Sequence, residues 1–326
     1  MTNPYRILSM SEDGDSSSLD PLRKVAEVDD REPDPDFLRE HIHEYDVYIA
    51  ALKVRFDREV AERGSKGRLK LVYTPSTGLD HLDLEALAEF GIEMRCIKTE
   101  YGLLDQVTST AELAFALMLS VARKIPAAHN AAMRGHWARD LYRGHQLSGK
   151  TLGVLGVGRL GSMMVEYGRG FRMKVIGCDP HPREPIPGLE YVDYDDFAER
   201  ADVISIHIHL TPENEHFLNA KRIAKMKDGL ILVNTSRGKV IDEEALLAAL
   251  QSEKVGGFGA DVIVGEWRDD LSDHPLIAYA RDHDNVTILP HLGGVSWEAQ
   301  FITRRFIAEK LAEIIRGWQR EGPPGS

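Results

Sequence analysis

The sequence predicts an α/β protein that is made of two domains, each with a parallel sheet. Short apolar runs alternate with amphipathic segments along almost the whole chain. This alternation is typical of parallel strands that are joined by helical crossovers. The chain has 326 residues, which is enough for two domains because single domains mostly contain about 100–200 residues.

The first part of the chain provides one complete alternating unit. We expect strands over Tyr5–Met10, Asp46–Ala51, Leu69–Thr74 and Gly91–Ile97. We expect helices over Leu19–Val25, Phe37–Tyr45, Arg58–Arg63 and Leu84–Phe90. Asp57 is a suitable N-cap for the helix that begins at Arg58, because its side chain can accept from the free N–H groups of the first turn.

A second and longer alternating unit follows. Its predicted helices include Thr108–Lys124, which is apolar around much of its girth, Ala127–Trp137 and Leu160–Gly168. Its predicted strands are Thr151–Leu155, Lys174–Cys178, Val203–Ile208, Leu230–Asn234, Gly257–Ile263 and Val286–Leu289. The closing helix, Glu298–Trp318, is followed by no strand, so we expect it to cross back to the first domain. The predicted domains are therefore residues 1–99 with 297–326, and residues 100–296.

Charge and composition exclude several classes of protein. The formal net charge is −12, and such a surface repels phosphate backbones, so we predict that nucleic acid is not a partner. No apolar stretch is long enough to span a bilayer, and Met1–Met10 lacks the pattern of a secretory signal. We therefore expect a cytoplasmic protein without a membrane segment. Two cysteines, Cys96 and Cys178, cannot form a disulfide framework or a cysteine-based metal site.

The strongest local motif is a glycine-rich turn between a predicted strand and a predicted helix. Gly156, Gly158 and Gly161 stand in the order G-x-G-x-x-G directly after Thr151–Leu155. In a dinucleotide site the first glycine permits the tight turn, the second lets the backbone approach a pyrophosphate, and the third allows close packing of helix and strand. A plain strand-to-helix turn is the alternative for the glycines alone.

An acidic residue in the right place favours the dinucleotide interpretation. Asp179 ends the next predicted strand, about 20 residues after the glycines, where the fingerprint expects an acid. A carboxylate there can accept both ribose hydroxyls of NAD, and it repels the additional phosphate of NADP. The sequence therefore predicts NAD as the cofactor and disfavours NADP.

Three polar residues follow the ends of later strands. Arg237 comes after Leu230–Asn234, Glu266 after Gly257–Ile263, and His291 after Val286–Leu289. Ligands of open α/β sheets bind at the carboxyl ends of the strands, so these side chains are candidates for one site. Each of them alone is compatible with a surface or structural role. His207 and His209 share one face of a predicted strand, but no third ligand accompanies them, so we predict no metal site.

These motifs together resemble the D-isomer-specific 2-hydroxyacid dehydrogenase family, which includes dehydrogenases of phosphoglycerate, glycerate, glyoxylate and lactate. The matching stretches are Gly156–Gly161, Cys178–Pro180, Asn234–Gly238, Asp242–Leu246, Asp261 with Glu266, Asp273–Leu276 and Pro290–Gly294. Thr110–Glu112 also matches, and Gly78–Asp83 matches more weakly. The resemblance implies a Rossmann-like NAD-binding domain, a flavodoxin-like substrate domain, an active-site cleft between them, and a homodimer formed through residues 108–146.

The resemblance also implies a role for each candidate. His291 would be the general base and acid, Glu266 would orient its imidazole and favour the imidazolium, and Arg237 would hold the substrate carboxylate and polarise the carbonyl. Backbone N–H groups of Thr77 and Gly78 would bind the carboxylate as well, although a simple turn is the alternative there. The implied cofactor residues are Gly156, Gly158, Arg159, Leu160, Gly161, Asp179, His207, Thr235, Ser236 and Asp261.

Two positions depart from the pattern of the family, and one alternative function is open. Phosphoglycerate enzymes of the family tend to carry an arginine where this chain has Ala51 and Leu52, with Lys53 and Arg55 nearby, so the resemblance leaves a phosphorylated substrate in doubt. His209 stands where the family has proline. Formate dehydrogenases of the superfamily carry Gln at the position of Glu266, which argues against formate. The leading prediction is hydride transfer between NAD(H) and a small 2-hydroxy or 2-oxo acid. The alternative is a non-catalytic, NAD-sensing dimeric scaffold of the corepressor type.

Overall fold

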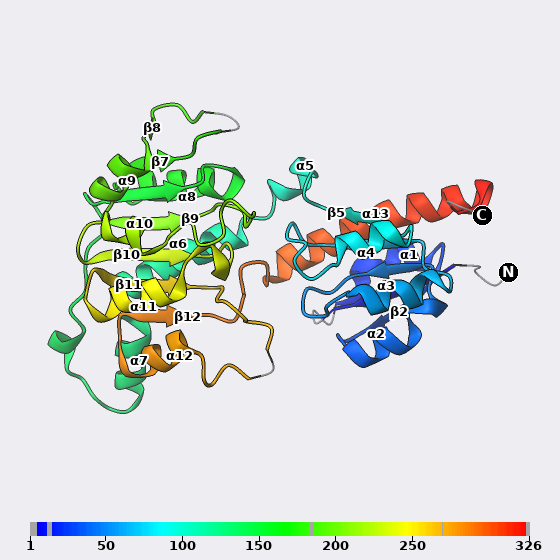
Figure 1. Cartoon of the computed structure of the whole chain (residues 1–326), viewed down its shortest axis with the longest axis horizontal. Coiled ribbons are helices and arrows are strands. Elements are labelled where there is room, and N and C mark those ends of the chain that lie inside the picture. Colours follow the sequence, from blue (N-terminus) through cyan, green and yellow to red (C-terminus); the bar gives the residue numbers. More distant parts are fainter. Residues whose placement is uncertain (1–4, 12–14, 183–184, 269, 324–326) are drawn as a thin grey trace. The chain divides into compact units, whose positions relative to one another are not determined.

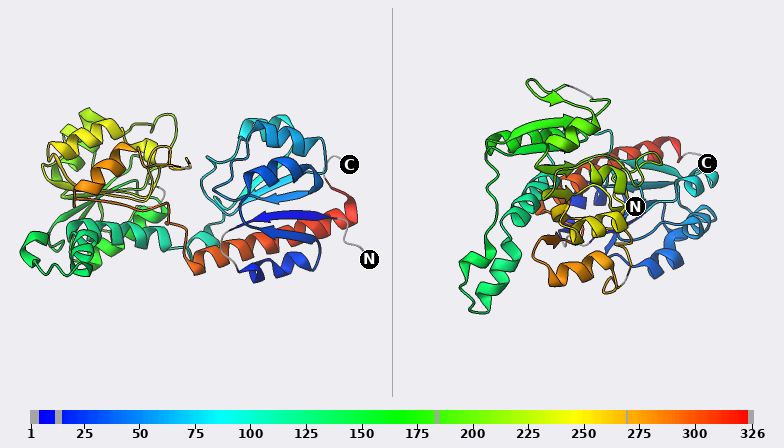
Figure 2. Two further views of the ribbon diagram at one scale, coloured as in Figure 1. Left: turned by 90° about the horizontal axis from the view of Figure 1, so that it is seen from below. Right: turned by 60° about the vertical axis from the view of Figure 1, so that its left-hand side comes forward.

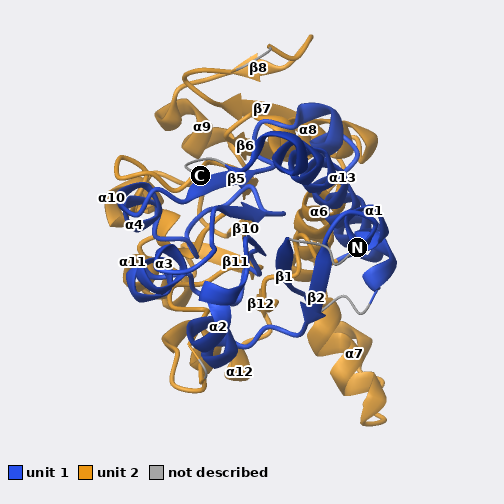
Figure 3. Cartoon of the chain, turned by 90° about the vertical axis from the view of Figure 1, so that its right-hand side faces the viewer, with its two compact units in different colours: residues 1–107, 296–326 blue, residues 108–295 orange. Residues whose placement is uncertain are grey.

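The chain forms two compact units, each of which contains its own parallel sheet (Figure 3). The computed structural model describes residues 5–11, 15–182, 185–268 and 270–323. The first unit comprises residues 1–107 and 296–326, and the second comprises residues 108–295. Helix α5 (Tyr101–Leu104) belongs to the first unit, whereas the sequence-based division at residue 99 placed it in the second.

The first unit is built on a five-stranded sheet with the order β2-β1-β3-β4-β5 (Figure 1). This is the flavodoxin-like order. The strands are β1 (Arg6–Met10), β2 (Glu27–Arg31), β3 (Val47–Ile49), β4 (Leu71–Thr74) and β5 (Glu93–Cys96). The helices are η1 (Ser16–Leu19), α1 (Asp20–Arg23), α2 (Pro35–His41), η2 (Ile42–Glu44), α3 (Arg58–Ser65), α4 (Leu84–Glu89) and α5. Asp57 caps α3 as predicted, since its side chain accepts from the N–H of Val60.

The edge strand β2 was missing from the sequence-based prediction. Its sequence, EVDDR, has no apolar alternation, and its single apolar residue, Val28, packs only partly buried against the apolar core. Its backbone nevertheless pairs in parallel with β1, from Arg6 opposite Glu27 to Met10 opposite Arg31. One of its acids, Asp30, accepts a hydrogen bond from Arg304, so the polar strand is fixed by an ion pair.

The long helix α13 (Trp297–Glu321) packs on the first unit, as the absence of a following strand predicted (Figure 2). Its buried face includes Ile307, Leu311 and Ile315, and these side chains join the apolar core beside β1. Buried polar contacts fix the same helix. Nη2 of Arg304 lies 2.9 Å from Oδ1 of Asp30, and the hydroxyl of Tyr5 donates to the carbonyl of Trp318 at 3.0 Å.

The second unit contains a seven-stranded sheet with the order β12-β11-β10-β9-β6-β7-β8, and every pair in it is parallel. The strands are β6 (Thr151–Leu155), β7 (Lys174–Cys178), β8 (Glu190–Tyr191), β9 (Val203–Ile206), β10 (Leu230–Asn234), β11 (Val255–Ala260) and β12 (Val286–Ile288). The chain starts at β6, moves outward to β7 and β8, and then reverses to β9 on the other side of β6. The carboxyl ends of β6 and β9 therefore flank the switch point where ligands bind in such sheets.

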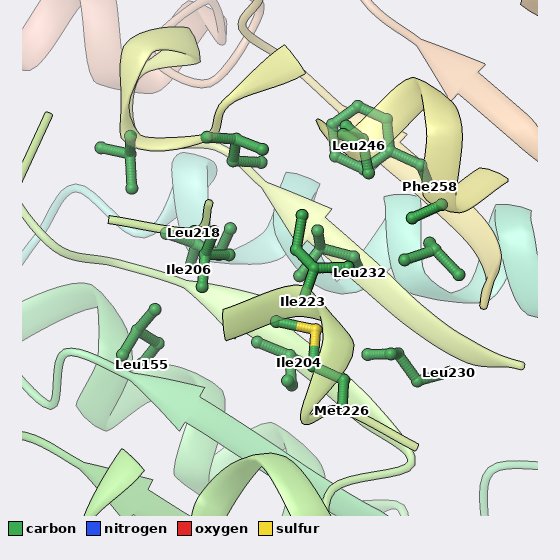
Figure 4. Close-up of a cluster of buried hydrophobic side chains, with 14 of the residues drawn as sticks. Leu155, Ile204, Ile206, Leu218, Ile223, Met226, Leu230, Leu232, Leu246 and Phe258 are labelled. Atoms are coloured by element: carbon green, nitrogen blue, oxygen red, sulfur yellow. The ribbon is translucent and has the colours of Figure 1, made fainter. Parts of the chain in front are cut away.

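Helices cover both faces of this sheet. They are α6 (Ser109–Ala122), α7 (Ile125–Met133), η3 (Arg139–Tyr142), α8 (Arg159–Gly170), α9 (Tyr194–Arg200), α10 (Ala220–Ala224), η4 (Gly238–Val240), α11 (Glu243–Gln251) and α12 (Pro275–Asp282). One apolar core joins side chains of β6, β9, β10 and β11 to those of α10 and α11 (Figure 4). On the other face α6, which its composition predicted to be buried, packs against the sheet with seven of its fourteen residues buried. Glycines in β11 let it approach closely, because a Cβ at Gly257 would lie 2.4 Å from Cγ1 of Val121.

Both cysteines are free thiols, as predicted, and Cys178 is buried at the end of β7. Burial raises the pKa of the Cys178 thiol to about 11. Among the described residues, no helix combines the length and the apolar character needed to cross a membrane.

Candidate active site

The glycine-rich turn joins β6 to α8, and each glycine has a different surrounding. Gly156 has φ +87°, in the left-handed region that favours glycine, and a Cβ there would lie 2.9 Å from the carbonyl of His207. A Cβ at Gly161 would lie 2.1 Å from the carbonyl oxygen of Gly156, so this position tolerates no side chain. A Cβ at Gly158 would meet nothing within 4 Å. The fold therefore requires Gly156 and Gly161. Gly158 instead leaves open backbone just before α8, which begins with Arg159 and Leu160.

Asp179 lies beside this turn, directly after β7. Its Oδ2 accepts from the N–H of Val157 at 2.9 Å, and its Oδ1 accepts from the N–H of His181 at 2.9 Å. The two amides fix the orientation of the carboxylate against the glycine turn. A carboxylate oxygen accepts more than one hydrogen bond, so the pair of oxygens keeps the capacity to bind ribose hydroxyls.

Two polar atoms near the switch point are buried and have no hydrogen-bond partner within the described ranges. They are Nδ1 of His207, just after β9, and Oγ1 of Thr235, just after β10. The other ring nitrogen of His207 lies 2.8 Å from Oγ of Ser205. Burial lowers the pKa of His207 to about 4, so the ring is neutral at neutral pH. Orphaned polar groups are costly in a folded protein, and their position at the strand ends fits a polar nucleotide ligand.

Arg237 is presented by a loop that the buried side chain of Asn234 organises. Oδ1 of Asn234 accepts from both the N–H and the hydroxyl of Ser236, and its Nδ2 donates to the carbonyl of Arg237 at 2.9 Å. Nη1 of Arg237 donates to the carbonyl of Ser236 at 2.7 Å. The sequence interpretation did not assign this role to Asn234, although a fully buried amide at the end of an apolar strand is a usable signal.

His291 and Glu266, which come from loops after neighbouring strands, meet in the structure. Nδ1 of His291 lies 2.9 Å from Oε1 of Glu266, and the two side chains are 17% and 14% exposed. The contact uses one ring nitrogen, so Nε2 is the atom that remains for proton exchange with a substrate. The backbone of His291 is left-handed, with φ +56°. The indole ring of Trp267, which the sequence did not single out, lies 5.2 Å from the imidazole ring, centroid to centroid.

Asp261 supports the backbone around His291. Its Oδ1 accepts from the N–H of Leu292 and its Oδ2 from the N–H of Gly293, both at 2.7 Å. Its own carbonyl accepts from the N–H of His291 at 2.9 Å. Burial raises the pKa of Asp261, while the two amide hydrogen bonds oppose this change. Both carboxylate oxygens thus hold the loop that carries the histidine.

The remaining predicted residues, Thr77 and Gly78, lie in the first unit after β4. Their turn is organised from within: the N–H of Ser76 donates to Oγ1 of Thr74, and the N–H of Gly78 donates to Oγ of Ser76 at 3.1 Å. Oγ1 of Thr74 also lies 3.2 Å from Nε2 of the buried His81. The Gly78 amide therefore already has an acceptor within its own turn.

A parallel sheet with a glycine turn and an acid at its switch point, followed by an arginine and a histidine–glutamate pair at successive strand ends, is typical of NAD-dependent dehydrogenases. Residues 115–293 match the family described as D-isomer specific 2-hydroxyacid dehydrogenase, NAD binding domain. The chain belongs to this family, and its second unit is the NAD-binding domain.

Relatives and solved structures agree with this assignment. The chain is 36% identical over 304 residues to a hydroxypyruvate reductase of Thermotoga maritima, covering 93% of this chain and 95% of the relative. It is 37% identical over 284 residues to a D-3-phosphoglycerate dehydrogenase of Methanocaldococcus jannaschii, covering 86% of this chain but only 52% of that protein. The chain therefore spans about half the length of that phosphoglycerate dehydrogenase. Its fold matches a D-lactate dehydrogenase from Aquifex aeolicus complexed with NAD and lactic acid, with a TM-score of 0.82, 27% identity and 96% coverage of both chains.

Proposed function

We propose that this chain catalyses reversible hydride transfer between NAD(H) and a small 2-hydroxy acid or 2-oxo acid of D configuration at the hydroxyl carbon. The observation that carries the proposal is the 2.9 Å contact between Nδ1 of His291 and Oε1 of Glu266, at the ends of adjacent strands. A partly buried histidine–carboxylate pair is suited to exchanging a proton with a hydroxyl or carbonyl oxygen.

The three residues at the strand ends of the second unit each have a distinct role in this reaction. His291 gives a proton from Nε2 to the carbonyl oxygen during reduction and removes it during oxidation. Glu266 fixes the ring orientation and stabilises the imidazolium by its negative charge. Arg237 binds the carboxylate and polarises the carbonyl. The nicotinamide, when bound, supplies or accepts the hydride.

The nucleotide is proposed to lie along the switch point of the second unit. Its pyrophosphate would face the open backbone at Gly158 and the N-terminus of α8, at Arg159 and Leu160. Its ribose hydroxyls would bind Asp179, which favours NAD over NADP. The orphaned atoms of His207 and Thr235 support polar contacts from the same ligand. Ser236 lies on the loop that carries Arg237, and the carboxylate of Asp261 holds the loop that carries His291, so we keep both residues as contributors to this region.

The first unit, residues 1–107 with 296–326, is proposed to provide substrate contacts through Thr77 and the backbone near Gly78. We infer an unphosphorylated substrate, because Ala51 and Leu52 occupy the positions where phosphoglycerate enzymes of the family carry arginine. The long match to a hydroxypyruvate reductase supports the same choice. We further propose a cytoplasmic homodimer that uses the arm formed by α7 and η3, where Met133, Trp137 and Leu141 are 71%, 89% and 71% exposed.

Oxidation of NADH by a panel of small 2-oxo acids, including hydroxypyruvate, glyoxylate and pyruvate, tests the proposed function. The unaltered protein should oxidise NADH with at least one acid, and His291→Ala should abolish turnover while NADH affinity stays within about twofold, because the imidazole moves the proton without holding the cofactor. Arg237→Lys keeps the charge but loses the planar two-pronged grip, so kcat/KM should fall by about 10²–10³. Full activity of His291→Ala would refute the assignment.

A further inference from the structure

Both hydrogen-bonding groups of the Val264 backbone are held by partly or fully buried side chains from two helices. Its N–H donates at 2.8 Å to Oε1 of Glu243, the first residue of α11. Its carbonyl lies 3.1 Å from Nε2 of His274, the N-cap of α12. Nε2 of His274 also lies 3.3 Å from Oε2 of Glu243, and the two side chains are 5% and 18% exposed. Glu243 and His274 thus close a ring of contacts around one residue; we call this pair the Val264 clamp.

The tautomer of His274 is fixed by its role as a helix cap. The N–H of Leu276 donates to Nδ1 of His274 at 3.3 Å, so Nδ1 is an acceptor and carries no proton. The ring proton is therefore on Nε2, where it faces both the Val264 carbonyl and the Glu243 carboxylate. A neutral imidazole thus supplies the donor that the clamp requires.

The clamped residue adjoins segments that carry two of the groups proposed to take part in the reaction. Glu266 follows Val264 by two positions, and its Oε2 accepts from the N–H of Ile263 at 3.3 Å. On the other side, a Cβ at Gly238 would lie 2.3 Å from the carbonyl carbon of Ile263 and 2.5 Å from the nitrogen of Val264. The residue after Arg237 therefore packs on the peptide that joins Ile263 to Val264, next to the Ile263 N–H that holds Glu266.

We propose that Glu243 and His274 are positioning residues that, by clamping Val264, hold Glu266 against His291 and keep the Arg237 loop in register with that pair. This inference rests on the proposed function of Arg237, Glu266 and His291. Glu243 and His274 act through the backbone, and neither is assigned a contact with a substrate or a cofactor. The geometry required for the pair is strict, because small errors in the position of a catalytic group cost large factors in rate.

Charge sets a second constraint on the clamp. The titratable groups that face this region are Glu243, His274, Glu266, His291 and Asp261. Burial raises the pKa of Glu243, and the negative charge of Glu266 acts in the same direction. The carboxylates of Glu243 and Glu266 must therefore be kept apart, although both lie close to Val264. The Nε2 donor of His274 lies beside the carboxylate of Glu243.

A matched pair of variants isolates the contact with the Val264 carbonyl. His274→Leu and His274→Gln both lose the acceptor for the Leu276 N–H, but only glutamine can still present an N–H donor near the position of Nε2. We expect kcat for His274→Leu to fall by about 10- to 100-fold with KM and NADH affinity nearly unchanged, and His274→Gln to recover most of the loss. Asn219→Ala, which removes the cap of α10, controls for the loss of a helix cap.

The other half of the clamp provides a second pair. Glu243→Ala removes the acceptor of the Val264 N–H, whereas Glu244→Ala, at the exposed neighbouring position, leaves it in place. Glu243→Gln keeps only one of the two contacts, since its amide cannot accept from both Val264 and His274. We expect the unaltered protein and Glu244→Ala to have the same, highest kcat. The kcat of Glu243→Gln should be lower, and that of Glu243→Ala should be the lowest. These variants decide the question even if His274→Leu does not fold.

A readout without substrate separates this inference from the proposed function. The proton on Nδ1 of His291 should give a protected, downfield NMR signal in the unaltered protein and in His274→Gln, and a weakened signal in His274→Leu and Glu243→Ala. If no oxo acid oxidises NADH, the proposed function fails, and the NMR comparison still tests the clamp. The clamp is overturned if His274→Leu and His274→Gln have equal kcat and equal signals, or if activity is lost only in proportion to folded protein.

Discussion

At the residue scale, His207 shows how a folded protein can hold an imidazole away from water. Its backbone N–H donates to the carbonyl of Leu155 at 2.7 Å, which fixes it beside the glycine turn. Its Nε2 contacts Ser205, while Nδ1 has no partner within the described ranges. A charged ring in this position would lose hydration without gaining an acid as a partner, and burial accordingly lowers its pKa to about 4.

This burial predicts a specific dependence of stability on pH. The ordinary pKa of histidine is 6.5, and in the folded protein that of His207 is about 4. Between these values the unfolded chain binds a proton that the folded chain does not bind. The contribution of His207 to the free energy of unfolding should therefore be constant above the unfolded pKa and should fall as the pH drops from 6.5 towards 4.

Urea unfolding of the unaltered protein and of His207→Gln measures this contribution. The difference in the free energy of unfolding between the two proteins should change in favour of the variant as the pH falls through this interval. His283→Gln, at an exposed position, is the control and should show no such change. A difference between His207→Gln and the unaltered protein that is the same at all pH values would contradict the assigned burial of the charge-free ring.

The sequence allowed the meeting of Glu266 and His291 to be predicted, but not the residues that support it. Both follow apolar strands, and parallel strands bring their carboxyl ends to one edge of the sheet, so their contact was predictable. The roles of Asn234, Glu243 and His274 were not, because they depend on which backbone groups lie within hydrogen-bonding distance after the helices pack. His274 is ten residues from Val264 and Glu243 is 21 residues away. No periodicity in the sequence records such a contact.

At the scale of elements, the β6–α8 turn contains one glycine that we propose to face the nucleotide, Gly158, and one that the fold requires, Gly161. Gly158→Ala should leave the thermal unfolding temperature nearly unchanged, because a Cβ there meets no atom within 4 Å, but it should weaken NADH binding where the backbone must approach a phosphate. Gly161→Ala should lower the unfolding temperature, because its Cβ would lie 2.1 Å from the Gly156 carbonyl oxygen. Gly170→Ala, with no atom near its Cβ, is the matched control and should retain both properties.

Calorimetry and NADH titration of these three variants give the two quantities independently. Equal losses of NADH affinity in Gly158→Ala and Gly170→Ala would show that open backbone at Gly158 has no connection with the nucleotide. An unaltered unfolding temperature for Gly161→Ala would contradict the close approach of α8 to β6.

The strands that were predicted correctly are buried ones, whose residues have to be apolar. The strands that were missed lie at sheet edges, where this requirement is absent. Thr151–Leu155, Lys174–Cys178 and Leu230–Asn234 were predicted with their observed ends, because central strands of a parallel sheet are covered on both faces and are continuously apolar. The edge strand β2 and the two-residue strand β8 were missed. Their pairing is supplied by the neighbouring strand, so their own side chains carry little periodic signal.

At the scale of the whole molecule, the arm of α7 and η3 is the feature that suggests self-association. Figure 3 shows α7 extending away from the rest of the second unit, and three large apolar side chains of the arm are more than two-thirds exposed. Exposed apolar surface of this kind is typical of protein interfaces. The proposed isologous dimer would bury the arm against a second copy of the chain.

Light scattering tests this arrangement with charged substitutions on the arm. The unaltered protein should have twice the mass of the chain, and Trp137→Glu combined with Leu141→Glu should reduce it to the mass of a single chain, since burying two unpaired carboxylates is unfavourable. Leu84→Glu places one such carboxylate on a 41% exposed leucine of the first unit and should remain dimeric. A single-chain mass for the unaltered protein at micromolar concentration would remove the dimer from the proposal.

The left-handed backbone at His291 means that the substitutions expected to raise thermal stability at this position would also remove the proposed catalytic side chain. A non-glycine residue with φ +56° stores conformational energy, on the order of 1 kcal/mol, that glycine would release and asparagine would reduce. A mutant library selected only for survival at high temperature should therefore enrich glycine or asparagine at this position. Its most stable clones would lack the imidazole that we propose transfers the proton, so the selection of stable variants has to include a screen for turnover.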